Sequence, residues 1–183
     1  MRVARQLFAT HGYAGTSVSD VGKSAGVTVP VIYQRFGNKA GLFVAVAEDA
    51  CRQGLVTMQA SVDAAKSLDE ALESTLRDIA AVHHIDPCIS AMVVTALVEA
   101  ERDADLGVRL KPVLQTLHQL CDGIAALAPA ELVATSADRR DLSRAVMALL
   151  SGVMTSSNFV HRPRDYERMV GSIGLLLRWG RGD

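Results

Sequence analysis

The sequence predicts an all-α protein in which a short N-terminal helix-turn-helix unit precedes a larger helical bundle. Apolar residues recur three or four positions apart along most of the chain, the spacing that places them on one face of a helix. Helix-start signals recur as well, because Ser17 and Ser67 each precede an acidic residue by three positions. The composition, 49% hydrophobic and 21% charged, is that of a globular protein. A chain of 183 residues has room for one domain of ordinary size, or for a small domain and a larger one.

The most informative stretch is residues 17–39, which read SVSDVGKSAGVTVPVIYQRFGNK. The Ser17 hydroxyl can cap a helix, and Asp20 has the spacing to reach back to the cap. Gly26 is suited to the positive φ that ends a helix, and Pro30 belongs in the first turn of the next one, at about residues 30–36. Two short helices joined by a turn of about three to four residues form the unit that places its second helix in the major groove of DNA.

The spacing also predicts which side chains of the second helix face outward and where the third helix begins. Ile32 and Phe36 should face inward, and Asn38 should cap a helix from Lys39 to about residue 61. Lys39 then lies at the positive end of that helix, a conflict that a nearby phosphate would remove. Spacing alone leaves open that this is an ordinary helical pair of an α-bundle. The outward residues are Thr28, Val29, Val31, Gln34 and Arg35.

The segment formed by residues 5–48 resembles the TetR family of bacterial transcriptional repressors. The resemblance rests on LFATHGYAGTSVSDVGKSAGV followed by IYQRFGNKAGLFVAV. The matching positions are Leu7, Phe8, Gly12, Tyr13, Thr16, Ser17, Val18, Ala25, Gly26, Val27, Tyr33, Phe36, Lys39 and Leu42. The resemblance implies a DNA-binding domain at residues 1–48 and a helical ligand-binding and dimerisation domain at residues 49–183. It further implies a homodimeric regulator, most often a repressor, that binds a palindromic operator and is released by a small-molecule effector.

Carried over residue by residue, the resemblance assigns a set of DNA-contacting residues. They lie in the DNA-binding domain at residues 1–48, called the head below. Contacts to base edges are implied for Thr28, Val29, Pro30 and Val31. Phosphate contacts or positioning of the head are implied for Ser17, Ser19, Tyr33, Gln34, Arg35 and Lys39, with Gln34 and Arg35 also in reach of bases. The helix offers mainly apolar groups to the groove, which suits thymine methyl groups and leaves few bidentate donors.

The sequence of residues 67–180 predicts the helices of the C-terminal domain, called the body below. Ser67 caps a helix ending near His84, Asp86 and Pro87 start a buried helix, and residues 106–127 form a helix that Pro112 kinks or restarts. The last two helices are expected at about residues 137–160 and 163–180. Their broad apolar faces indicate a dimer interface, as the resemblance implies. The alternative is that these faces complete the core of the monomer.

An effector pocket is a better candidate for a second site than catalytic chemistry. We expect no catalytic residue, no metal site and no cofactor, because adjacent His83 and His84 point about 100° apart on a helix and no phosphate-binding loop is present. The protein is therefore expected not to be an enzyme. Plain core packing is the alternative role for every pocket candidate, and the effector is expected to be apolar or amphipathic. The candidates are Met92, Thr95, Glu99, Leu117, Cys121, Met147, Leu150 and Met154.

Charge, cysteines and hydropathy set the remaining expectations. The formal net charge is −1, but residues 1–49 carry five Lys or Arg against three Asp or Glu, which fits a small DNA-binding head on an acidic body. Three widely spaced cysteines indicate buried hydrophobic residues of a protein in a reducing compartment. The alternative is that one of them serves as a redox sensor. No apolar run is long enough to span a bilayer, so a cytoplasmic protein is expected.

The alternative function is a helical small-molecule-binding or scaffolding protein with a degenerate head. It is motivated by the weak positive charge of the head and by the reduction of the family's usual basic arm to Arg2 and Arg5.

Overall fold

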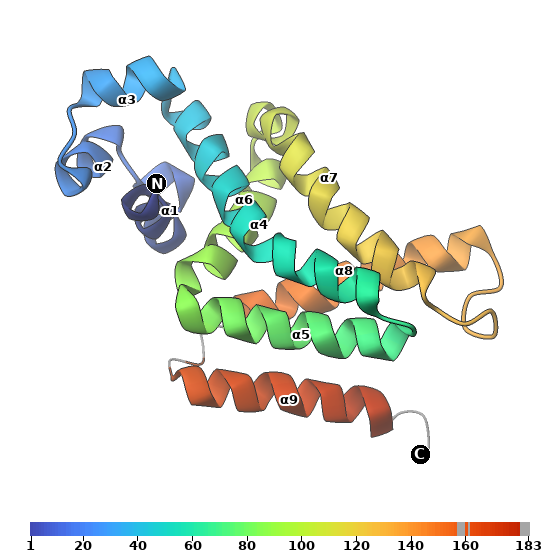
Figure 1. Cartoon of the computed structure of the whole chain (residues 1–183). Coiled ribbons are helices and arrows are strands. Elements are labelled where there is room, and N and C mark those ends of the chain that lie inside the picture. Colours follow the sequence, from blue (N-terminus) through green and yellow to red (C-terminus); the bar gives the residue numbers. More distant parts are fainter. Residues whose placement is uncertain (157–159, 161, 180–183) are drawn as a thin grey trace. The chain divides into compact units, whose positions relative to one another are not determined.

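The computed structural model describes residues 1–156, 160 and 162–179, and these residues form helices and no strands. Their nine helices, α1 to α9 (Figure 1), confirm the predicted all-α fold. The chain packs as two compact units, Met1–Gln53 with Cys88–Gln115 (unit 1) and Gly54–Pro87 with Thr116–Asp183 (unit 2). The functional division after residue 48 stays a prediction.

Unit 1 contains the helix-turn-helix. Its α2 begins as expected, because the Ser17 hydroxyl accepts a hydrogen bond from the Asp20 amide at 3.0 Å and donates to the Asp20 carboxylate at 2.6 Å. Gly26 ends α2 in the left-handed conformation with φ of 67°. The helices of unit 1 are α1 (Arg2–Gly15), α2 (Val18–Ala25), α3 (Val29–Phe36), the first part of α4 (Lys39–Ala64), most of α6 (Pro87–Arg102) and the first part of α7 (Ala104–Ala126).

Unit 2 contains α5 (Leu68–Ile85), α8 (Ser136–Ser156), α9 (Pro163–Trp179) and the remaining parts of α4 and α7. Helices α5 and α9 lie side by side (Figure 1). Between them the buried rings of His83 and Tyr166 stack with centroids 4.2 Å apart, and the Tyr166 hydroxyl donates to the Val153 carbonyl oxygen of α8 at 2.9 Å. Burial raises the pKa of Tyr166 to about 12 and lowers the pKa of His83, so α9 is attached through neutral side chains.

Several predicted helices differ from the structure in extent. Helix α1 is assigned to Gly15, although its backbone leaves the helical region at Gly12. Helix α4 ends at Ala64 rather than at about residue 61, and α7 runs through Pro112 without a new start. A proline removes one backbone hydrogen bond, and the buried side chains of Leu110 and Val113 on either side hold the helix in place. Helix α8 ends at Ser156, residues 157–159 lie outside the described part, and Val160 is not helical. Helix α9 ends at Trp179, and residue 180 lies outside the described part.

Helix α4 begins against the end of α3, and Gly41 makes this close approach possible. The Asn38 side-chain oxygen accepts a hydrogen bond from the Gly41 amide at 2.8 Å, which confirms the predicted cap. A Cβ atom at Gly41 would collide with the Phe36 carbonyl oxygen. Any larger residue at this position must therefore move α4 away from α3.

We predict that Gly41→Ala lowers the free energy of unfolding by about 1–3 kcal/mol, because the collision outweighs the gain in helix propensity. Gly152→Ala is the matched control, since Gly152 has no atom within 4 Å of an added Cβ and should gain up to about 1 kcal/mol. Urea denaturation followed by circular dichroism measures both changes. A Gly41→Ala protein as stable as the parent would contradict this packing.

Candidate nucleic-acid interface

Three aromatic rings form the core of the head. The Phe43 ring of α4 meets the rings of Phe8 and Tyr13 edge to face, with centroids 5.0 Å away in each case. Phe8 and Phe43 are fully buried, and the Phe8 and Tyr13 rings stack at 6.4 Å. Edge-to-face packing of aromatic rings stabilises a protein beyond what the burial of their apolar area contributes. The cluster therefore joins α1 to α4 on either side of the helix-turn-helix.

A backbone break at Gly12 turns Tyr13 into this cluster. Gly12 has φ of 70° and ψ of 179°, a combination that residues with a Cβ rarely adopt. The buried Thr16 hydroxyl lies 2.8 Å from the Gly12 carbonyl oxygen and 3.1 Å from that of Leu7, so it holds the turn that follows. The Tyr13 amide donates to the Glu99 carboxylate of α6 at 3.4 Å. The backbone break at Gly12 is thus stabilised by the Thr16 hydroxyl within the head and by the Glu99 carboxylate of α6.

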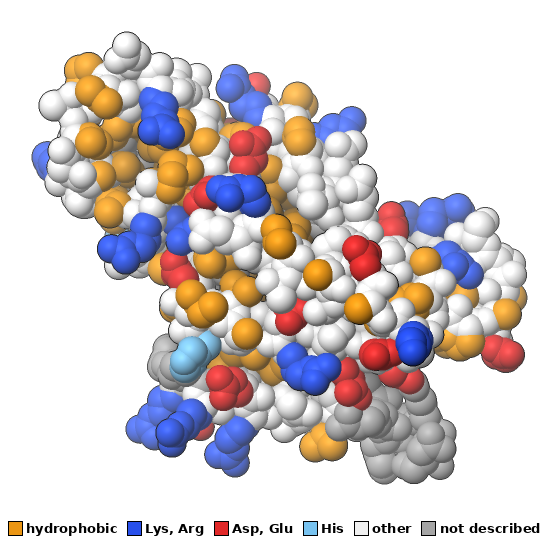
Figure 2. Space-filling model, viewed as in Figure 1, with side chains coloured by type: hydrophobic (Ala, Val, Ile, Leu, Met, Phe, Trp, Pro, Cys, Tyr) orange, Lys and Arg blue, Asp and Glu red, His pale blue; other side chains and the backbone are white. Residues whose placement is uncertain are grey.

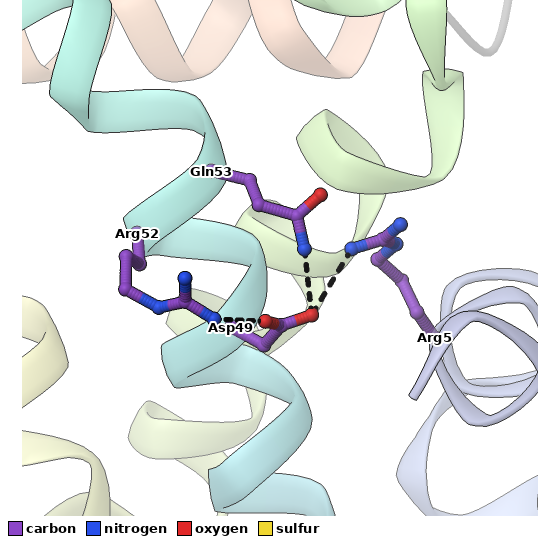
Figure 3. Close-up of polar contacts among 4 residues, drawn as sticks. All are labelled: Arg5, Asp49, Arg52 and Gln53. Carbon is purple, nitrogen blue, oxygen red and sulfur yellow. Dashed lines mark hydrogen bonds and ion pairs between the residues drawn. The ribbon is translucent and has the colours of Figure 1, made fainter.

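A second contact between α1 and α4 is ionic (Figure 3). The Arg5 guanidinium lies 3.4 Å from the Asp49 carboxylate, and the two side chains are only 6% and 16% exposed. Asp49 also accepts from the Gln53 amide at 2.7 Å and pairs with the exposed Arg52. Charges withdrawn from water require partners, so Asp49 is the residue on which this group depends. Sequence reasoning assigned no role to it.

Helix α3 presents a solvent-exposed face. Ile32 is 4% exposed and faces inward as predicted, whereas Val31 is 52% exposed and Tyr33 45%. Val29, expected outward, is only partly exposed, because it lies on the buried side of the helix with Phe36. The remaining predicted contact residues that are exposed are Ser17, Ser19, Thr28, Pro30, Gln34 and Arg35.

Some of the predicted polar contact residues already have partners within the head. The Arg35 guanidinium lies over the Phe36 ring at 5.5 Å from its centroid, and the Ser17 hydroxyl is taken up by the α2 cap. The Lys39 ammonium lies 4.5 Å from the centre of the Tyr13 ring and donates to the Ala14 carbonyl oxygen at 3.4 Å. The conflict between Lys39 and the α4 dipole is therefore relieved in part by the ring and the carbonyl oxygen.

The charge of this surface is positive. Residues 17–39 carry Lys23, Arg35 and Lys39 against the single acid Asp20. Burial raises the pKa of Tyr13, assisted by Asp103. The Tyr13 ring that carries the Lys39 ammonium is therefore uncharged at neutral pH.

An apolar pocket of about 500 Å³ opens beside this surface. It is lined by residues of α1, α2, α3 and α4, with Val31 and Arg35 on its α3 side. Figure 2 shows hydrophobic side chains gathered over this part of unit 1, next to basic ones. The interface thus combines cations with exposed apolar side chains.

The predicted effector-pocket residues fall in both units. Met92, Thr95 and Glu99 belong to unit 1, and the polar groups of two of them are engaged, because Thr95 donates to the Ala91 carbonyl oxygen at 2.8 Å and Glu99 accepts from Tyr13. The other five belong to unit 2, where four are buried and Met147 is partly exposed. Their convergence on one pocket stays a prediction. These five are Leu117, Cys121, Met147, Leu150 and Met154.

Three other kinds of site concern metal ions, thiols and membrane spans. Within residues 1–156, 160 and 162–179, no group of three or more His, Cys, Asp or Glu side chains could hold a metal ion. Burial raises the pKa of the free thiols of Cys51 and Cys121 to about 12, which suits packing rather than redox chemistry, and Cys88 is partly exposed. In the same residues no single helix is long and apolar enough to cross a bilayer, although α5 and α6 pass that test as a pair.

Comparison with known proteins places this head in a family. Residues 1–46 match the family described as bacterial regulatory proteins, tetR family. The transcriptional repressor ComR of Escherichia coli is 46% identical over 43 residues, which are 24% of this chain and 20% of ComR. The repressor AcnR of Corynebacterium glutamicum is 40% identical over 57 residues, 31% of this chain and 30% of AcnR. The chain thus matches between a fifth and a third of the length of these relatives.

Solved structures resemble the whole fold. FadR from Bacillus subtilis, in complex with stearoyl-CoA, has a TM-score of 0.76 at 20% identity, covering 96% of this chain and 94% of that one. FadR from Bacillus halodurans, a fatty acid degradation regulator, has a TM-score of 0.75 at 22% identity with the same coverage.

The fold and the interface define a helix-turn-helix protein with a helical C-terminal domain. The match over residues 1–46 confirms the resemblance to the TetR family that the sequence suggested. The matched family and the similar structures are regulators and not enzymes.

We predict that Asp49→Ala lowers the free energy of unfolding by about 2–3 kcal/mol, because it removes a carboxylate that pairs with the buried Arg5 guanidinium. Arg52→Ala removes an exposed partner of the same carboxylate and should cost less than about 1 kcal/mol. Urea denaturation of the two variants measures the difference. Equal losses would show that the Arg5 contact does not hold α1 to α4.

Proposed function

We propose that the chain is a transcriptional repressor that binds a palindromic operator as a homodimer and is released by a small effector. The observation that carries the proposal is the exposed face of α3, presented by a capped helix-turn-helix with a net positive charge. The repressor role is supported by ComR and AcnR, whose matches cover the same region. In the proposed complex, two heads enter successive major grooves about 34 to 36 Å apart.

Contacts to phosphate supply the sequence-independent part of the affinity. Ser19, Tyr33 and Lys39 are the proposed contact residues on the rim of the α3 face. Lys39 is held by Tyr13 and Ala14 at the N-terminus of α4, and this arrangement supports a fixed cation rather than a mobile one. A fixed cation loses less side-chain entropy when it meets a phosphate.

We predict that Lys39→Ala weakens binding by a similar factor on all DNA sequences and reduces the slope of log K against log salt by about 0.9, the value for one phosphate contact. Fluorescence anisotropy on a selected duplex and on unrelated duplexes, at several salt concentrations, measures both effects. Thermal unfolding is followed alongside, because the variant also loses the Tyr13 contact.

Lys66→Ala is the matched control, since Lys66 is an exposed lysine outside the head and should leave the slope unchanged. An unchanged slope for a folded Lys39→Ala protein would remove Lys39 from the interface. No DNA binding by the parent protein would instead favour the alternative of a degenerate head.

The dimer is proposed to form through α8 and α9. Support comes from α9, where Leu175 and Leu176 are 60% and 66% exposed although Tyr166 and Val170 of the same helix are buried. One face of α9 thus packs within its own unit, and adjacent leucines remain in water. Association through a symmetric patch would bury them.

We predict that Leu176→Glu converts the dimer to a monomer, because the interface would have to bury a carboxylate without a partner. The dissociation constant should rise at least about tenfold, the effect of roughly 1.4 kcal/mol, as measured by sedimentation equilibrium. Val108→Glu, which changes a 74% exposed valine of α7, should leave the dimer intact. A monomeric parent protein, or a dimeric Leu176→Glu protein, would contradict this interface.

The effector is proposed to be apolar or amphipathic. The buried apolar and sulfur-containing side chains among the pocket candidates support this class, as does the stearoyl-CoA bound to Bacillus subtilis FadR. Such a compound would release DNA by binding better to a state whose heads do not match the operator, and its effect cannot exceed its differential affinity for the two states. Titration of the protein–DNA complex with stearoyl-CoA is the first test, with loss of anisotropy expected. Unchanged anisotropy would exclude that compound.

A further inference from the structure

Helix α5 buries a hydroxyl group that has no hydrogen-bond partner among the residues that the structure describes. It belongs to Thr75, whose side chain is fully buried in unit 2. A threonine within a helix often donates to the carbonyl oxygen four residues before it, and Thr95 and Thr155 both do so at 2.8 Å. For Thr75 that oxygen belongs to Ala71, whose two lone pairs are taken by the helix itself and by the Ser74 hydroxyl at 3.1 Å. The Thr75 hydroxyl therefore finds no acceptor within its own helix.

A carboxylate oxygen in the same position lies one helical turn away. Oδ2 of Asp78 is buried and has no hydrogen-bond partner in the described part of the chain. Residues three apart are neighbours on a helix surface, about 60° apart around the axis, so one small group is within reach of both side chains. Asp78 as a whole is only partly buried, so the two residues extend from the margin of a buried face to its interior. Thr75 and Asp78 are called the α5 polar pair below.

The α5 polar pair faces away from α9, which lies along the other side of α5 (Figure 1). The pocket between α5 and α9 is lined from α5 by residues that include Leu76, Arg77 and Ala80, and helical geometry places these opposite the pair. His83 of α5 also has a ring nitrogen, Nδ1, without a described partner. It lies about 12 Å further along the helix than Thr75, and its ring stacks on Tyr166. The pair is thus a polar feature separate from the attachment of α9.

Unpartnered polar atoms of this kind destabilise a free protein. Burial removes them from water without replacing the lost hydrogen bonds, and for this reason most buried polar groups in proteins have partners. The side chains around the pair on the same side of α5 are buried and apolar, namely Leu72, Ile79 and Val82. A ligand that donates hydrogen bonds to the pair would remove the cost of burial. The pair is therefore better explained by binding than by the folding of the chain.

The chemistry of the two atoms defines what such a ligand carries. An ionised carboxylate only accepts hydrogen bonds, and a threonine hydroxyl can accept one as well. A protonated amine donates to both and also compensates the negative charge, which makes the hydrogen bond to the carboxylate a strong one. We propose that Thr75 and Asp78 bind the ammonium group of the effector, which is an apolar amine. This inference rests on the proposed function, and it narrows the proposed apolar or amphipathic class to cations.

The first test compares ligands that differ only in their polar end. Hexylamine, octylamine and decylamine are titrated into the full chain at neutral pH, followed by the carboxylic acids and the alcohols of the same lengths. Isothermal titration calorimetry, at concentrations below micelle formation, measures the affinities. The amine that binds best should bind at least about tenfold more tightly than the acid of its length, the effect of one hydrogen bond to a charged group.

The second test removes the charge of the pair. Asp78→Asn keeps the size of the side chain, and it should weaken binding of that amine at least about tenfold while changing binding of the alcohol less. Asp141→Asn is the matched control, because Asp141 is an exposed carboxylate of α8 that pairs with Arg144. This variant should bind the amine as the parent does.

The third test separates binding from stability. Thr75→Val replaces an unpartnered hydroxyl by a methyl group, so without ligand it should lower the equilibrium constant of unfolding at least about fivefold, although it weakens amine binding. Thr155→Val is the matched control, because it removes a hydroxyl that has a partner and should bring no gain in stability. Urea denaturation followed by circular dichroism measures both. A residue that serves only the core would not combine a gain in stability with a loss of binding.

Three results would each overturn the inference. They are a series in which no amine binds more tightly than its acid, an Asp78→Asn protein that binds the amine as tightly as the parent, and a Thr75→Val protein that is no more stable than the parent. The last would mean that the hydroxyl has a partner in the free protein, such as a buried water. None of these measurements requires DNA, so the proposed function fails separately, if the parent protein binds no operator. Release of a bound operator by an acid or an alcohol of the series would support the proposed effector response while this inference failed.

Discussion

The head depends on the packing of Phe8, Tyr13 and Phe43. This cluster joins α1 to α4, and the α2–α3 pair lies between these helices in the sequence. Tyr13 reaches the cluster only because the backbone breaks at Gly12, and its ring in turn carries the Lys39 ammonium at the start of α4. This aromatic cluster thus helps to position both the helix that we propose enters DNA and a cation that we propose flanks it.

The same break connects the head to α6. Glu99 accepts the Tyr13 amide proton, and α6 and the first part of α7 pack in unit 1 with the helix-turn-helix. The head is therefore not an independent three-helix domain in its packing, even though the family match covers only residues 1–46. A displacement of α6 would act on the residue that anchors the aromatic cluster. In the proposed response to an effector, a movement of α6 would therefore reach α3 through contacts within unit 1, because both helices belong to that unit.

Local chemistry made much of the fold predictable. Ser17 with Asp20, Gly26, and Ser67 with Glu70 gave helix boundaries within about one residue, because caps act through neighbours in sequence. The exposed side of α3 followed from helical periodicity except at Val29, which lies on the buried side. The partners of Lys39 and Asp49 could not be predicted, since Ala14 and Arg5 lie far away in the sequence and carry no local signal. Whether the eight pocket candidates line one pocket could not be predicted for the same reason. Apolar periodicity identifies the buried face of a helix but not the residues against which that face packs.

The central claim is that α3 reads a specific DNA sequence. The most direct measurement is selection of protein-bound fragments from sheared genomic DNA of the source organism at two salt concentrations, followed by sequencing. Our account predicts that one palindromic sequence is recovered at both concentrations, because base contacts persist when phosphate contacts are screened. Recovery of sequence-independent fragments alone, lost at the higher salt concentration, would contradict it.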